Sequence, residues 1–145
     1  MATDGRREFF IFNDYGPEPL AVNVANAAML NCNYRTILWT GEHLQLTLMK
    51  IDRGDDIGLE VHSDVDQYLM IIDGTGLVTM GKSRDNLNYQ KTVRCGYGIF
   101  VPAGTWHNLI NTGNKPLRLT SVYAPPEHPH GTVHPTKEIA MQQGD

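Results

Sequence analysis

Turn-forming residues interrupt this sequence at short intervals, and this spacing favours strands over long helices. Fourteen glycines and eight prolines are spread through 145 residues, mostly between short apolar runs. The runs are rich in β-branched and aromatic side chains, which suit strands. The length suits one domain. We therefore predict a single-domain, all-β protein with little helix.

Seven to nine short strands are expected within residues 36–124. After His43 the chain alternates Leu44, Leu46 and Leu48 with other residues, a period of two that predicts a strand with one core-facing side. Residues 57–62 are predicted to form another strand, and residues 68–80 a hairpin. Many short strands separated by Gly and Pro turns are typical of an antiparallel sandwich or barrel, the jelly roll included.

The two ends of the chain differ from this pattern. Residues 1–35 are predicted to be an N-terminal extension, with a short helix within residues 24–30. A strand within residues 9–12 could pair with a sheet edge. Residues 125–145 are predicted to be a C-terminal tail with one or two helical turns within residues 136–143. The strand-rich segment, residues 36–124, is the expected domain.

Charge and composition exclude several classes of partner. Twelve basic and 16 acidic residues give a net charge of −4 without a basic run, so binding to nucleic acid or to an anionic membrane is not expected. No apolar stretch approaches the roughly 20 residues that span a bilayer. The first residues do not resemble a signal peptide. Two distant cysteines, Cys32 and Cys95, fit a reduced compartment. We predict a cytoplasmic protein.

Four polar side chains have spacings that could bring them together on neighbouring strands. Glu60 and His62 are two residues apart, so both would lie on one face of a strand. Gln67 follows a short polar turn, and His107 follows a Pro-x-Gly turn at the head of another strand. Two imidazoles and a carboxylate with open positions form the metal face of non-haem Fe(II) oxygenases. These residues are therefore candidate metal ligands.

Two segments of the chain resemble the motifs of the cupin superfamily. The first is Gly54-x5-Glu60-x-His62-x4-Gln67-x6-Gly74, and the second is Gly96-x5-Pro102-x-Gly104-x2-His107-x3-Asn111. The resemblance implies a cupin jelly-roll β-barrel over residues 36–124, with one divalent metal ion inside, and a homodimer. More narrowly, the chain is similar to small bacterial cupins grouped with mannose-6-phosphate isomerase-like proteins.

The first motif departs from the family pattern at two positions. Glu60 stands where the family usually has a histidine, and Gln67 stands where it usually has the glutamate. The formal charge of the ligand set stays at −1, as retention of a divalent cation would require. A harder oxygen ligand in place of an imidazole favours Fe, Mn or Zn over copper. Gln67 is the weakest of the four candidates, and could instead hydrogen-bond to bound water.

The resemblance implies a mononuclear metalloenzyme acting on a small polar metabolite, either a sugar or sugar-phosphate isomerase-like enzyme or a dioxygenase. The alternatives are a non-catalytic module that binds a sugar or another small molecule, and a fold that has lost its metal. Glu60 is a candidate catalytic residue as well as a ligand, two roles that conflict. A phosphate would require a basic side chain near the mouth, for which Arg35, Lys50 and Arg118 are candidates.

The sequence also offers candidates for a substrate pocket and for a second metal site. Leu69, Leu109 and Trp39 are candidate walls of a substrate pocket. The tail histidines His128, His130 and His134 resemble a metal cluster by composition alone. A polar, proline-rich tail explains them equally, and such a tail could also cover the mouth of the barrel.

Overall fold

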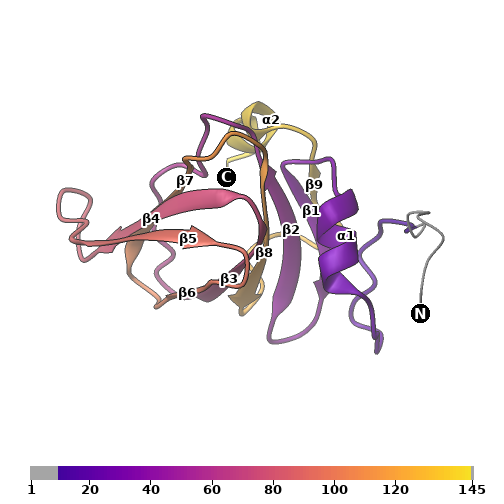
Figure 1. The fold of residues 1–145 in the computed structure, drawn as a ribbon. Helices are drawn as coiled ribbons and strands as arrows, with labels where there is room; N and C mark the ends of the chain where they lie inside the picture. The colour runs from indigo at the N-terminus through magenta and orange to yellow at the C-terminus, as the bar shows by residue number, and fades with distance from the viewer. Residues whose placement is uncertain (1–9, 145) are drawn as a thin grey trace.

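The structure is a computed structural model that describes residues 10–144, and two antiparallel sheets make up most of it (Figure 1). The elements are α1 (Val24–Leu30), β1 (Arg35–Thr40), β2 (Gln45–Ile51), β3 (Asp66–Asp73), β4 (Thr75–Gly81), β5 (Tyr89–Arg94), β6 (Gly98–Val101), β7 (Trp106–Asn111), β8 (Leu117–Ala124), β9 (Val133–His134) and α2 (Lys137–Gln142). One sheet has the order β6-β3-β8-β2-β1-β9 and the other has the order β5-β4-β7. The predicted all-β jelly roll with little helix is confirmed.

The main hydrophobic core contains residues from both sheets. Strand β3 alternates buried Gln67, Leu69 and Ile71 with more exposed neighbours, and β7 alternates in the same way. Leu69 and Leu109 are 2% and 1% exposed and belong to this core. Because a strand turns successive side chains to opposite faces, the same alternation that builds the core also directs Gln67 and His107 inward.

Strand β2 is buried on both faces, which the sequence did not reveal. One face carries Gln45, Thr47 and Met49, all 2% exposed or less. Leu48, on the opposite face, packs with Leu38 and α1 in a second, smaller core. Helix α1 covers this outer face of the six-stranded sheet (Figure 1). The interior of the jelly roll therefore has polar as well as apolar walls.

The prediction of a strand over residues 57–62 was wrong. Residues 57–62 form a single isolated bridge, Glu60 with His107, and a second one, Asp56 with Ile110, lies just before them. Gly58 lies between them with φ +87°, which lies outside the range of a strand and interrupts the ladder. The segment still runs beside β7, so it brings Glu60 opposite His107.

The N-terminal extension and the tail both pack against the six-stranded sheet. Helix α1 has the predicted bounds, whereas residues 10–12 are not a strand and Phe9 lies outside the described residues. In the tail, β9 pairs with β1 and adds an edge strand to the sheet. Helix α2 follows within the expected range. Neither helix has the length and apolarity needed to cross a bilayer.

The jelly roll is not a closed barrel. Strands β5 and β6 are edge strands of different sheets, and no ladder joins them in the described part of the chain. A cavity of about 720 Å³ lies between them, with Val78, Val93, Ile99 and the exposed Phe100 among its walls. The closed barrel implied by the family resemblance is therefore wrong in this detail, although the fold class stands.

Candidate metal centre

Glu60, His62 and His107 meet at one point of the structure. Their ligand atoms all lie within 4.8 Å of one another. The backbones of Glu60 and His107 exchange two hydrogen bonds, of 3.0 Å and 2.9 Å, which fix these residues opposite each other. The Gly104 N–H donates to the His62 carbonyl at 2.8 Å, which ties the third residue to the turn before β7. The predicted convergence of two imidazoles and a carboxylate is present.

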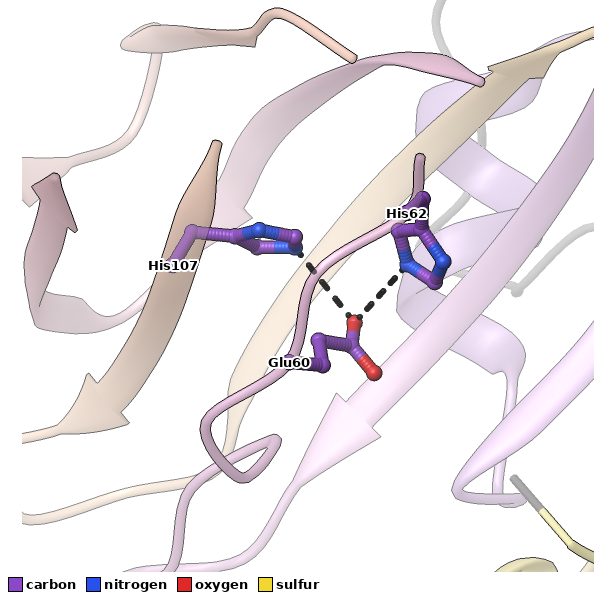
Figure 2. Close-up of side chains that lie close together, drawn as sticks. All are labelled: Glu60, His62 and His107. Atoms are coloured by element: carbon purple, nitrogen blue, oxygen red, sulfur yellow. Dashed lines mark hydrogen bonds and ion pairs between the residues drawn. The ribbon is translucent and has the colours of Figure 1, made fainter. Parts of the chain in front are cut away.

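Both imidazoles direct the same nitrogen at the same oxygen. Nε2 of His62 lies 3.3 Å from Glu60 Oε1, and Nε2 of His107 lies 3.5 Å from it. Figure 2 shows the carboxylate of Glu60 between the two rings. His107 Nδ1 lies 3.0 Å from the Thr105 carbonyl, which only accepts, so this nitrogen carries the proton. The lone pair of His107 Nε2 in the neutral ring therefore faces the carboxylate.

This donor set fits a divalent cation. His107 is 2% exposed, and its buried Nε2 makes no hydrogen bond within residues 10–144. A carboxylate oxygen and an imidazole lone pair are both acceptors, so the neutral ring faces Glu60 favourably with a cation between them, and without a cation the ring must carry a second proton on Nε2. Two histidines and one carboxylate are ligands that Fe(II), Mn(II) and Zn(II) accept.

The two histidines also determine the charge state of Glu60. Burial alone would raise the pKa of this carboxyl, but in the metal-free protein the hydrogen bonds and charges of the His107 and His62 rings in their protonated form outweigh burial and lower the pKa from 4.5 to about 2. Glu60 is therefore ionised throughout the neutral range. A carboxylate with so low a pKa is well suited to binding a cation and poorly suited to taking up a proton.

The C-terminal tail forms a wall of this site. A cavity of about 260 Å³ is bounded by Glu60 and His62 on one side and by Glu127, His128, His134 and other tail residues on the other. Glu127 Oε2 lies 3.4 Å from His62 Nδ1. The sequence offered no signal for Glu127, because no motif covers the tail and its position depends on contacts with distant residues.

The remaining tail histidines have structural partners. The Arg35 guanidinium donates to His134 Nδ1 at 2.9 Å, so the proton of this ring lies on Nε2, which donates to Gln143 Oε1 at 3.1 Å. His130 Nε2 lies 2.9 Å from the Gly16 carbonyl. A metal cluster of the three tail histidines is therefore not formed, and the tail covers the site instead.

Gln67 lies on the inner face of β3, 4% exposed. Its Nε2 donates to Ser121 Oγ at 2.8 Å, while its buried Oε1 has no partner among the described residues. Gln67 is opposite Tyr123 in the β3–β8 ladder, and the Tyr123 ring lies 5.8 Å from the His62 ring. Opposed residues of a ladder share a face, so Gln67 lies on the side of the sheet that carries the site. Its role as a ligand stays a prediction.

The three predicted pocket residues do not line the cavity beside Glu60 and His62. Leu69 and Leu109 are core residues, and the indole of Trp39 donates to the Glu18 carbonyl at 2.7 Å. Their part in substrate binding stays a prediction.

Comparison with known proteins agrees with the fold. A family model described as a cupin domain matches residues 47–123, more than half of the chain. The chain belongs to the cupin family.

Among its relatives is the uncharacterized protein YrkC of Bacillus subtilis, 56% identical over 135 residues that cover 93% of this chain and 73% of the relative. The uncharacterized protein L612 of Acanthamoeba polyphaga mimivirus is 38% identical over 77% of this chain and 69% of its own. The crystal structure of BH2720 from Bacillus halodurans is 56% identical, covers 90% of this chain and 98% of its own, and has a TM-score of 0.89. The family model shows the cupin family, and none of these relatives shows the narrower mannose-6-phosphate isomerase-like group.

Proposed function

We propose that this cupin binds one divalent transition-metal ion through Glu60, His62 and His107 and acts on a small, polar, unphosphorylated molecule. The observation that carries the proposal is the convergence of two Nε2 atoms on Glu60 Oε1, at 3.3 Å and 3.5 Å. When bound, the ion would polarise a carbonyl or hydroxyl of the substrate as a Lewis acid, and iron would also permit reaction with dioxygen.

The walls of the adjoining cavity support a polar, uncharged substrate such as a sugar or another polyhydroxy compound. Glu60 and Glu127 are both acidic, and the lining contains no lysine or arginine within the described residues. Two carboxylates would repel a phosphate group, which proteins usually bind with basic side chains. A volume of about 260 Å³ is at the lower end for small-molecule pockets, so the ligand is small.

The basic residues considered for phosphate binding are used elsewhere. Arg35 is 2% exposed and contacts His134. The Arg118 guanidinium donates to the Asn31 carbonyl at 2.7 Å, and Lys50 lies 3.9 Å from Asp52. These contacts favour an unphosphorylated sugar over a sugar phosphate.

The low pKa of Glu60 favours the ligand role over the role of a general base. This property also supports a second candidate function, a cupin that binds a small metabolite without converting it. A binder needs the metal and the cavity but no proton-transfer group.

Metal analysis tests the first part of the proposal. We expect close to one equivalent of iron, manganese or zinc in the purified protein, and less than about one-tenth of an equivalent in folded His62→Ala and His107→Ala variants. A folded His62→Ala variant with full metal content would exclude the site.

Thermal shifts of the metal-loaded protein with matched sugars and sugar phosphates test the ligand class. Stabilisation by the phosphates alone would contradict the proposal. Product detection by NMR then separates enzyme from binder, since a binder gives a shift without turnover. The homodimer and the cytoplasmic location stay predictions, and light scattering of the purified protein checks the first.

A further inference from the structure

We propose that Glu127 is a positioning residue for the metal centre, which holds the His62 ring so that Nε2 faces the ion. The inference rests on the metal binding proposed above. It assigns a role to the C-terminal segment 125–134, which lies outside the cupin motifs.

The contact between Glu127 and His62 sets the proton of the imidazole. Oε2 of Glu127 lies 3.4 Å from Nδ1 of His62, and Nε2 of the same ring lies 3.3 Å from Glu60 Oε1. A carboxylate with its proton lost can only accept, so Glu127 favours the tautomer protonated at Nδ1. Glu60 faces Nε2 in the same way, so a metal ion that takes the Nε2 lone pair would displace the proton there, and the remaining proton on Nδ1 would be held by Glu127. A carboxylate behind a histidine ligand fixes the ring orientation and raises its basicity.

Each histidine of the site has an acceptor beside its Nδ1, but the two acceptors come from different parts of the chain. The Thr105 carbonyl accepts from Nδ1 of His107 at 3.0 Å, and Thr105 is two residues from His107 in the chain. Glu127, by contrast, reaches His62 only if the tail is in place. The orientation of one ligand is therefore local, whereas that of the other depends on a distant segment.

Gln45 holds this segment in place. Its side chain is fully buried on β2, and its Oε1 accepts from the backbone nitrogens of Glu127 at 3.2 Å and His128 at 3.0 Å. Its Nε2 donates to the His128 carbonyl at 2.8 Å. Three hydrogen bonds from one amide fix the backbone on which the Glu127 side chain is carried. Gln45 is not a candidate metal ligand, so its effect on the metal would pass through the tail.

Metal affinity in three variants tests the inference. Zn²⁺ affinity is measured by competition with a chromogenic chelator for the wild type, Glu127→Ala, Glu127→Gln and Gln45→Leu. We expect Glu127→Ala to weaken binding by about 10- to 100-fold. Glu127→Gln retains an amide oxygen that accepts from Nδ1–H, so it should recover part of that loss. Gln45→Leu, which leaves the metal ligands intact, should weaken binding in the same direction.

The matched control is Glu42→Ala, which removes an exposed carboxylate from the turn between β1 and β2, 86% exposed at its side chain. It should bind zinc as the wild type does. Thermal melting identifies any variant that has lost its fold, and the conservative Glu127→Gln variant keeps the comparison meaningful if Gln45→Leu unfolds.

A second measurement does not need metal. NMR spectra of the ring nitrogens report which nitrogen of His62 carries the proton. In the metal-free wild type both nitrogens face a carboxylate, so we expect Nδ1–H to be populated, whereas Glu127→Ala leaves only Glu60 beside the ring and should shift the proton to Nε2. Wild-type protein that takes up no zinc would refute the proposed function, while these spectra would still decide the role of Glu127. Unchanged zinc affinity together with an unchanged His62 tautomer in Glu127→Ala would overturn the inference.

Discussion

The ion pairs around Glu60 predict a specific difference in acid stability between the wild type and Glu60→Gln. The carboxyl has a pKa of about 2 in the folded protein and 4.5 as its ordinary value. A group with a depressed folded-state pKa stabilises the protein above its unfolded-state pKa. That contribution is lost as the pH falls through the folded-state value. For Glu60 the window runs from about pH 5 down to about pH 2.

The magnitude follows from the difference between the two pKa values. Each pKa unit corresponds to about 1.4 kcal/mol, so the full contribution is about 3 kcal/mol, of which about 2 kcal/mol is lost by about pH 3. The side chain of Glu60 is 22% exposed, so solvent screens these interactions only in part. Glutamine does not ionise, so Glu60→Gln should lack this component of the pH dependence.

Urea unfolding of the metal-free proteins at several pH values between about 5 and 3 measures the difference. Other carboxylates, such as Asp14, titrate in both proteins and cancel in the comparison. Glu42→Gln, at an exposed position, should follow the wild type. Parallel loss of stability in the wild type and Glu60→Gln would refute the close approach of the two imidazoles to this carboxylate.

Three further substitutions test other parts of the structure. Asp14→Asn should lower the free energy of unfolding by about 2 kcal/mol in chemical denaturation. Asp14 Oδ2 accepts hydrogen bonds from Thr40 Oγ1 and the Gly131 N–H, and an amide nitrogen in its place cannot accept them. A loss below about 0.5 kcal/mol would contradict this reasoning. Gly58→Ala should cost about 1–2 kcal/mol in the same assay, since φ is +87° there, and an unchanged midpoint would show that the backbone relaxes. Gln67→Leu should reduce zinc affinity about tenfold if the unpartnered Oε1 serves the metal or its water, and unchanged affinity would assign Gln67 a purely structural role.

Local patterns predicted most of the secondary structure. The helix Val24–Leu30 has the predicted bounds, because capping by Asn23 is a local signal. The prediction of a strand around Gly58 was wrong because an alternating pattern does not reveal a positive φ. The burial of the outer face of β2 was not predicted either, since alternation cannot show that α1 covers the second side of the strand.

The sequence predicted the part of the site that lies within the two motifs, and not the part that lies outside them. Spacing together with the resemblance to the cupin motifs predicted that Glu60, His62 and His107 lie close together, because each is fixed near a turn whose geometry its neighbours determine. Glu127 was not predictable, since its position depends on hydrogen bonds from Gln45, far away in sequence. Contacts of that kind leave no periodicity along the chain.

The wide separation of the metal ligands along the chain has a consequence for folding. Glu60 and His107 meet only after β3 to β7 have been arranged, and the Glu127 contact forms only after β8 as well. Long-range pairing of this kind is slow relative to the formation of local turns. Zinc capture during refolding should therefore lag behind the appearance of β-sheet signal, and the metal would stabilise the completed molecule rather than guide its assembly.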